Sequence, residues 1–346
     1  MKKVLTLGLS LSLATLMLAG CGSDNDSSSS KSDGGEKTTS GSLKTGLAVI
    51  SKTESSKDVS DKDGLAQIDS TIVAVTVDKD GKIVECIIDA AQTKINFDAT
   101  GKLKTDLKAE FKTKDELGDN YGMKKASTIG KEWYEQAAAL AKYVTGKTVD
   151  EVKGIRLSDD GKAADADLST SVTVSISGYI DAIEKAVKNS KELGAKAGDK
   201  LGLGVVTNIA KSADAGEKDG VAQAYSSYGV VTVDKSGKIT SATIDASQTN
   251  VNFSKAGKIT SDLKAKNMTK NELGDEYGMK KASSIGKEWY EQAAALSKYV
   301  TGKTLDEVKG IKVEDGKPTD TDLKASVTIS ITDYIAVISK AVGSAK

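Results

Sequence analysis

The chain has 346 residues, with 49 Lys or Arg and 49 Asp or Glu, so its formal net charge at pH 7 is zero. It contains no histidine and only two cysteines, which excludes Ser-His-Asp and Cys-His catalysis, histidine-ligated metals, a disulfide scaffold and a cysteine-rich zinc or iron–sulfur site. The balanced charge gives no indication of nucleic-acid binding. We expect no metal site and no catalytic residue, so any chemistry must come from hydroxyls, carboxylates, lysines or a bound cofactor.

The N-terminus is typical of a bacterial lipoprotein signal peptide. Lys2 and Lys3 precede an apolar segment, residues 4–18, and the sequence Leu-Ala-Gly-Cys follows at its end. A positive region, a short apolar region and small residues before the cleavage point are the parts of a signal peptide. We expect residues 1–20 to be removed and Cys21 to carry diacylglycerol, whose two acyl chains anchor a protein stably in a membrane. The alternative is a buried N-terminal helix.

Residues 21–43 are predicted to form a lipidated tether. Between Cys21 and Leu43 the sequence is mostly Ser, Gly, Asp, Lys and Thr, and such a composition cannot pack a core. A flexible chain of this length spans about 25 Å on average. The predicted location is therefore the extracellular face of a cell membrane, with a globular part held off the lipid surface.

The rest of the chain repeats itself with a period of 156 residues and loses one residue near the end. Residues 115–148 and 271–304 differ at four positions of 34. A period this long indicates tandem domains rather than a solenoid. We place copy one at 44–190, a joint at 191–199 and copy two at 200–346.

Each copy contains a predicted β-hairpin. In copy one, residues 72–77 and 83–88 flank the turn Asp-Lys-Asp-Gly at 78–81. In copy two, residues 229–233 and 239–244 flank the turn Asp-Lys-Ser-Gly. β-Branched segments around such a turn predict two paired strands.

Helices follow the hairpin, so the predicted fold class is α+β in two tandem copies. A helix is predicted over 127–145, and Thr148 with Glu151 forms a capping box for a second, short helix. A strand is predicted over 171–176, and an amphipathic helix begins at Ser177. The counterparts in copy two are a strand over 326–331 and a helix that begins at Thr332.

The cysteine and the paired carboxylates are interpreted as structural residues. Cys86 aligns with Ala242 in copy two, so the copies share no thiol chemistry and Cys86 is interpreted as a small strand residue. Asp165 and Asp167 are interpreted as turn and capping groups, because a calcium loop needs more oxygen ligands at alternating positions.

The sequence Tyr-Gly-Met-Lys-Lys-Ala-Ser occurs at 121–127 and again at 277–283. Its lysines and the N-terminus of the helix after it are suited to a phosphate, and its Tyr or Met is suited to a planar ring. The alternative is that Tyr121, Trp133 and Tyr134 are core residues of an aromatic-poor domain. The candidate pocket residues are Tyr121, Met123 and Lys124 in copy one and Tyr277, Met279 and Lys280 in copy two.

Two further motifs resemble the FMN-binding-domain family. They are the hairpin Val-x-Val-Asp-Lys-Asp-Gly-Lys-Ile and, far downstream, an Asp followed six residues later by a Thr and then a terminal amphipathic helix. In that family the pattern Asp-x-x-Ser/Thr-Gly-Ala-Ser/Thr carries FMN in phosphoester linkage on its final hydroxyl, installed by a flavin transferase. The resemblance implies covalent FMN on Thr173 and on Thr328.

The remaining motif positions match in part. Serine stands where the family has glycine, valine stands where it has alanine, and copy two has Ala325 at the first hydroxyl position. The residues at these motif positions are Asp167, Thr170 and Ser171 in copy one and Asp322 and Ser326 in copy two.

The whole chain resembles the two-domain, pheromone-encoding lipoproteins of Gram-positive extracellular electron transfer. That resemblance implies an electron carrier with two covalent FMN groups rather than a substrate-specific enzyme. Its electrons would come from a membrane quinone-linked dehydrogenase and pass to extracellular acceptors such as ferric iron. Residues 13–20 also resemble a released octapeptide pheromone. The alternative is a ligand-binding or structural surface lipoprotein without a cofactor, in which Thr173 and Thr328 are only strand residues.

Overall fold

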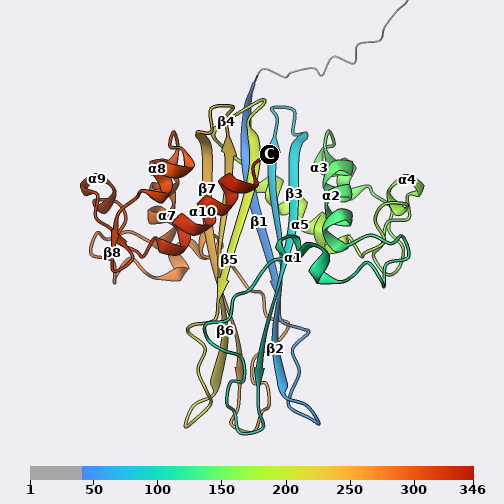
Figure 1. Ribbon diagram of the computed structural model, residues 1–346, viewed down its shortest axis with the longest axis vertical. Coiled ribbons are helices and arrows are strands. Elements are labelled where there is room, and N and C mark those ends of the chain that lie inside the picture. The colour runs from blue at the N-terminus through green and yellow to red at the C-terminus, as the bar shows by residue number, and fades with distance from the viewer. Residues whose placement is uncertain (1–40) are drawn as a thin grey trace, which may run out of the picture. The chain divides into compact units, whose positions relative to one another are not determined.

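The computed structural model describes residues 41–346, drawn as coloured ribbons in Figure 1. The predicted signal peptide, Cys21 and residues 21–40 of the predicted tether lie outside the described residues. Strand β1 (Ser42–Lys52) begins one residue before Leu43, which is buried. The sheet therefore includes the last two residues assigned to the tether, because Leu43 packs its apolar side chain.

Two antiparallel sheets form the centre of the described chain (Figure 1). In the first the strand order is β3-β2-β1-β4, and in the second it is β5-β6-β7. A short pair, β8 and β9, lies near the C-terminal end. The strands after β1 are β2 (Gly64–Val77), β3 (Ile83–Phe97), β4 (Lys191–Lys196), β5 (Lys200–Asn208), β6 (Gly220–Val233), β7 (Ile239–Phe253), β8 (Val313–Glu314) and β9 (Lys317–Pro318).

Helices lie on the two sides of these sheets in Figure 1, with α2 to α4 on one side and α7 to α9 on the other. Three strands followed by helices occur twice along the described chain, while β4, β8 and β9 each occur in one half only, and the fold class is α+β, as predicted. Copy one contains α1 (Lys114–Leu117), the 3-10 turn η1 (Gly118–Tyr121), α2 (Trp133–Val144), α3 (Val149–Lys153), α4 (Ala166–Ser169) and α5 (Ser177–Lys188). Copy two contains α6 (Lys270–Leu273), η2 (Gly274–Tyr277), α7 (Trp289–Val300), α8 (Leu305–Lys309), α9 (Thr321–Lys324) and α10 (Thr332–Ser344).

The last helix of each copy packs directly on the strands of its own copy. Helix α5 buries Ile180, Ile183 and Ala186 against β1 and β2. Each fully buried aliphatic side chain contributes about 1.5–3 kcal/mol. Gly46 makes the approach possible, because a Cβ at that position would overlap the Ala186 carbonyl. Gly202 has the same role under α10.

The two copies pack against each other through their sheets. One cluster joins Leu47 and Val49 of β1 to Leu203 and Val205 of β5. At the far ends of β3 and β7, Phe97 and Phe253 stack with ring centroids 4.2 Å apart. All described residues belong to one compact unit, and the independent folding of each copy stays a prediction.

Several predicted elements are confirmed. The hairpin is present in both copies, with strands longer than predicted. Thr148 and Glu151 form their capping box, in which the Thr148 N–H donates to Glu151 Oε2 at 2.7 Å. The terminal helices begin at Ser177 and Thr332, as predicted.

Other predicted elements are wrong or shorter. Residues 171–176 and 326–331 form no continuous strand, because the first N–H groups of each segment bond to the preceding turn and to a buried glutamine. Of these residues, only Ser175 forms an isolated bridge, to Lys162. The helix predicted over 127–145 begins at Trp133, because residues 127–131 form a turn. The predicted joint at 191–199 contains β4, which pairs with β1.

Candidate functional site

Thr173 lies in a loop that is held by one buried side chain. The Thr173 N–H donates to Gln136 Oε1 at 2.8 Å, and the Val174 N–H donates to the same oxygen at 3.2 Å. The Thr173 hydroxyl also donates to this oxygen, at 3.3 Å. Gln136 is fully buried on α2. Because buried backbone donors need partners, this glutamine fixes the position of the threonine.

The amide nitrogen of the same glutamine reaches the segment at 121–127. Gln136 Nε2 donates to Ser127 Oγ at 3.2 Å and to the Lys131 carbonyl at 3.4 Å. The glutamine therefore connects the threonine loop to the Tyr-Gly-Met-Lys-Lys-Ala-Ser segment, two regions that the sequence singled out separately.

Copy two contains the same arrangement. The Thr328 N–H donates to Gln292 Oε1 at 2.8 Å, and the Thr328 hydroxyl does so at 3.3 Å. Gln292 Nε2 donates to Ser283 Oγ at 3.2 Å. Each distance is the same in the two copies, so the geometry is a property of the repeated unit.

A buried carboxylate shapes the other end of the segment. Glu132 accepts the N–H groups of Met123, at 2.8 Å, and Lys124, at 2.9 Å. Glu288 does the same for Met279 and Lys280. Hydrogen bonds to an ionised acceptor are stronger than those between neutral groups. This contact turns the backbone of the segment toward the helix that follows.

A cavity of about 450 Å³ lies beside Thr173. Met123, Ser127, Gln136 and Thr173 line it, together with Lys162 from the neighbouring loop. The structure thus brings one of the predicted pocket residues, Met123, to the same cavity as the predicted attachment site.

The other predicted pocket residues lie elsewhere. Tyr121 donates from its hydroxyl to Gln92 Oε1 at 3.3 Å, and its ring lies 4.6 Å from Lys114 Nζ. Lys124 is exposed and does not line the cavity. In copy two, Tyr277 likewise donates to a glutamine and lies under a lysine, Met279 packs against the core, and Lys280 is exposed.

The remaining motif residues lie within or just after a short helix in each copy, α4 or α9. Asp167 and Thr170 are exposed, and the Thr170 hydroxyl donates to the Asp167 carbonyl at 2.9 Å. Ser171 is half-buried and has no positive φ, so serine is unstrained where the family pattern has glycine. Asp322 and Ser326 occupy the same places beside α9.

Cys86 is a strand residue, as predicted, and lies in β3. Burial raises the pKa of its thiol to about 12, so the reactive thiolate is scarce at neutral pH. Asp89 is buried and accepts the N–H groups of Ala90 and Asp115. This carboxylate holds the start of α1 rather than facing a ligand.

Two residues essential to this geometry, Gln136 and Glu132, were not singled out from the sequence. The available signal was a polar residue on the apolar face of a helix, three positions after Trp133 and four before Leu140. Within residues 41–346, no helix is long and apolar enough to cross a bilayer. The same range contains no group of three or more Cys, Asp or Glu side chains placed to hold a metal ion.

Comparison with known proteins gives one distant similarity. Part of the chain is 34% identical, over 116 residues, to a protein named chlorophenol reductase from Desulfitobacterium hafniense. The similar region covers 24% of this chain and 36% of that protein, so the chain spans about a third of the length of the curated relative it matches. No family model matches the chain, and no solved structure matches it.

Proposed function

We propose that this chain is a surface-anchored electron carrier with one FMN bound covalently to each copy, at Thr173 and at Thr328. The observation that supports the proposal best is the shared threonine–glutamine–serine contact. In both copies it holds the motif threonine against a segment that contains Met, Lys and Ser.

The residues beside Thr173 fit a flavin. Pockets for drug-sized ligands measure about 300–1,000 Å³, and the cavity of about 450 Å³ lies within that range. Met123 offers an apolar surface to a ring, and Lys162 and Ser127 offer donors to its polar edge or to a phosphate. Bound there, the flavin would supply the redox chemistry.

The protein's own residues would attach and orient the group. A threonine hydroxyl is a poor nucleophile at neutral pH, so attachment needs a flavin transferase as a partner. Asp167 of α4 and Thr170, the residue that follows this helix, are exposed and offer that enzyme a recognition surface. Gln136 would keep the modified loop fixed against α2.

The proposed donor is a membrane quinone-linked dehydrogenase, and the proposed acceptors are extracellular oxidants such as ferric iron. The name of the distant relative, a reductase, is in keeping with a redox role. The chain would hold no substrate site for turnover, since the flavin itself accepts and donates the electrons.

Intact mass and peptide mass spectrometry test the attachment sites. Co-expression with a competent flavin transferase should add the mass of one FMN less one water to each copy. Thr173→Ser should keep the modification in copy one, because the hydroxyl remains, whereas Thr173→Ala should lose it. Two unmodified threonine peptides in a yellow, transferase-treated protein would overturn the assignment.

Anchoring through Cys21 is a separate part of the proposal. Cys21→Ala should shift the protein out of the detergent phase, because the thiol receives the lipid. Cys86→Ala is the matched control and should leave the partition unchanged. An unchanged membrane fraction for Cys21→Ala would contradict the lipid anchor.

A further inference from the structure

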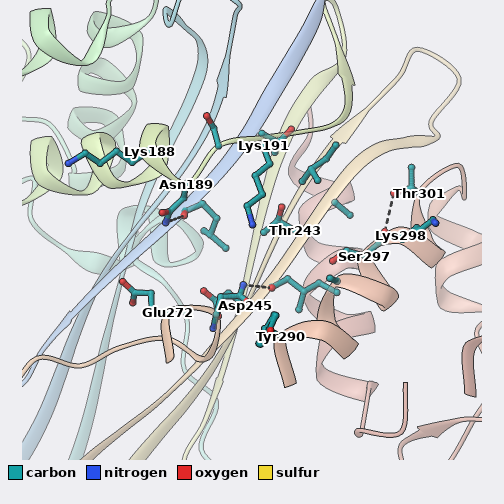
Figure 2. A pocket seen from close by; sticks show the side chains of 18 residues that line it. Lys188, Asn189, Lys191, Thr243, Asp245, Glu272, Tyr290, Ser297, Lys298 and Thr301 are labelled. Carbon is teal, nitrogen blue, oxygen red and sulfur yellow. Dashed lines mark hydrogen bonds between the residues drawn. The ribbon is translucent and has the colours of Figure 1, made fainter. Parts of the chain in front are cut away.

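A second, larger cavity of about 830 Å³ lies between the two copies (Figure 2). Leu47 of β1 and Lys191 and Leu193 of β4 line one side, and Ile244 of β7 with Ala294 and Lys298 of α7 line the other. Neither copy forms this cavity alone, and Thr173 and Thr328 are not among its lining residues.

Strand β4 gives the cavity a fixed wall. Lys191 pairs with Thr45 of β1, and Ala195 is fully buried. Gly194 has φ 112° and lies so close to the Thr240 carbonyl that a Cβ there would overlap it. The second sheet of the described chain has only three strands and no equivalent of β4. The wall that β4 forms therefore has no counterpart in the sheet of copy two.

The floor of the cavity is apolar. Leu47 and Ile244 lie on the facing strands, and Ala294 lies on the exposed side of α7. Leu193 is 36% exposed, one of few large apolar side chains so exposed in the described chain. A ligand with an apolar body would cover the exposed surface of Leu193 and Ala294, and burying apolar surface is worth about 25 cal/mol per Å².

Two acids, Asp245 and Glu272, line the cavity together with the lysines, and both acids are bonded within the protein. Asp245 accepts the N–H groups of Ala246 and Asn271, and Glu272 is paired with Lys185 at 2.7 Å. The two acids on the wall are thus already engaged within the protein.

The lysines of the wall differ from these acids. Lys188 pairs with Glu184 at 3.0 Å, but Lys191 and Lys298 have no carboxylate within 4.0 Å among residues 41–346. Figure 2 shows the Lys191 side chain extending from β4 toward Thr243. An anionic group in the cavity would find this ammonium without displacing an internal partner.

We propose that the cavity between the copies binds a small amphipathic organic anion, with an aromatic or aliphatic body on the apolar floor and a carboxylate, sulfonate or phosphate near Lys191 and Lys298. Drug-sized ligands fill pockets of this volume. The proposal is independent of flavin attachment, because it uses other residues and a different part of the molecule.

A pair of fluorescent probes tests the proposal on the full mature chain. 8-Anilinonaphthalene-1-sulfonate has an aromatic body and one sulfonate, and N-phenyl-1-naphthylamine has the same body without the charge. The sulfonate should bind at one saturable site per chain. Replacing both lysines, as Lys191→Met/Lys298→Met, should weaken its binding about tenfold, as expected for two solvent-accessible ion pairs, and should leave the neutral probe unchanged.

The repeat supplies matched controls. Lys142 and Ala138 occupy in α2 the places that Lys298 and Ala294 occupy in α7, and neither lines this cavity. Ala294→Phe should block both probes, whereas Ala138→Phe and Lys142→Met should leave both affinities unchanged. If Ala294→Phe fails to fold, Ala294→Leu repeats the test with a smaller side chain.

Three outcomes would overturn the proposal. One is sulfonate binding that survives Ala294→Phe in a folded protein. Another is an equal loss of binding with Ala138→Phe. The third is a lysine double variant that binds the sulfonate as tightly as the parent chain does.

Discussion

The two copies are alike at the motif threonine and differ around a lysine shared by both. Lys270 of copy two lies 4.7 Å from the ring centroids of Tyr225 and Tyr277, and it donates to the Tyr225 hydroxyl at 2.9 Å. Burial lowers the pKa of this lysine to about 8. Lys270 also lies 5.1 Å from the centroid of the Trp289 ring, so it contacts three rings. Lys114, its counterpart, contacts two rings, those of Tyr121 and Trp133.

One substitution accounts for the difference. Position 69 of copy one, an aspartate, corresponds to Tyr225 of copy two. Asp69 accepts hydrogen bonds from Gln67, at 2.8 Å, and from Gln92, at 3.0 Å. The comparison teaches that the threonine geometry depends on backbone groups that must be satisfied, and so it persists, while an aromatic shell around a lysine changes with a single residue.

We expect the largest effect from substituting the motif threonines, which should remove the proposed cofactor from one copy at a time. Thr173→Ala should abolish flavin attachment in copy one and leave copy two yellow, and Thr173→Ala/Thr328→Ala should be colourless and unable to reduce ferric iron. Stability should fall by only about 1 kcal/mol per hydroxyl. Absorbance and peptide mass spectrometry measure the result. Loss of both flavins from a single substitution would contradict independent attachment in the two copies.

The next effect concerns the contact between the copies. Phe97→Ala should lower the free energy of unfolding by about 3–5 kcal/mol, because a buried ring is lost. Phe253→Ala should cost as much. Since the two rings touch, the double variant should cost less than the sum of the single variants. Denaturant titration tests this, and strict additivity would argue against the stack.

A somewhat smaller effect is expected at the buried glutamines. Gln136→Ala leaves two backbone donors, Thr173 N–H and Val174 N–H, without a partner, and should cost about 2–4 kcal/mol. Gln292→Ala should cost the same in copy two. Urea unfolding of both variants compares the copies, and a cost below 1 kcal/mol in either would contradict the role assigned to the glutamine. Gln92→Ala, at a half-buried position, is the control.

We expect the smallest effect in the pH dependence of stability, where Lys270 of copy two should act and Lys114 of copy one should not. Because the pKa of folded Lys270 is about 8, below its unfolded value near 10.5, the unfolded chain binds more protons between these values. The contribution of Lys270 to stability should therefore rise with pH from about 8 to 10.5, by about 1–3 kcal/mol. It is measured as a difference between variants, because the Cys86 thiol, whose pKa burial raises from 9.0 to about 12, contributes in the opposite direction above pH 9. Lys270→Met should remove this rise, and Lys114→Met should keep it. Chemical unfolding at several pH values measures the stability of each variant. Identical plots of stability against pH for Lys270→Met and Lys114→Met would contradict the prediction.

Local patterns were sufficient to predict the hairpins, the capping box at Thr148 and the helix that begins at Ser177. Each depends on neighbours in sequence. Residues 171–176 read Ser-Val-Thr-Val-Ser-Ile, which is typical of a strand, but their N–H groups find partners in the preceding turn and in Gln136, far away in the sequence. A local sequence pattern cannot predict the contact between these N–H groups and Gln136.

In the candidate site and in the predicted joint at 191–199, contacts between residues far apart in the sequence were likewise not predicted. The motif threonines and Met123 were located from sequence, and Met123 does share a cavity with Thr173. Gln136 and Glu132 were not, because their roles exist only once the loops are folded. Residues 191–196, Lys-Glu-Leu-Gly-Ala-Lys, are polar as a linker would be, but they pair with β1 at the edge of a sheet.

The helices α2 to α4 and α7 to α9 lie on opposite sides of the central sheets (Figure 1). Each motif threonine follows the short helix of its own side, α4 for Thr173 and α9 for Thr328. With the proposed flavin attachment, a bulky partner docked at one threonine would leave the other accessible, so the chain would have two independent docking sites. A partner that is itself bivalent would link such chains end to end, and light scattering of a mixture would show the growth.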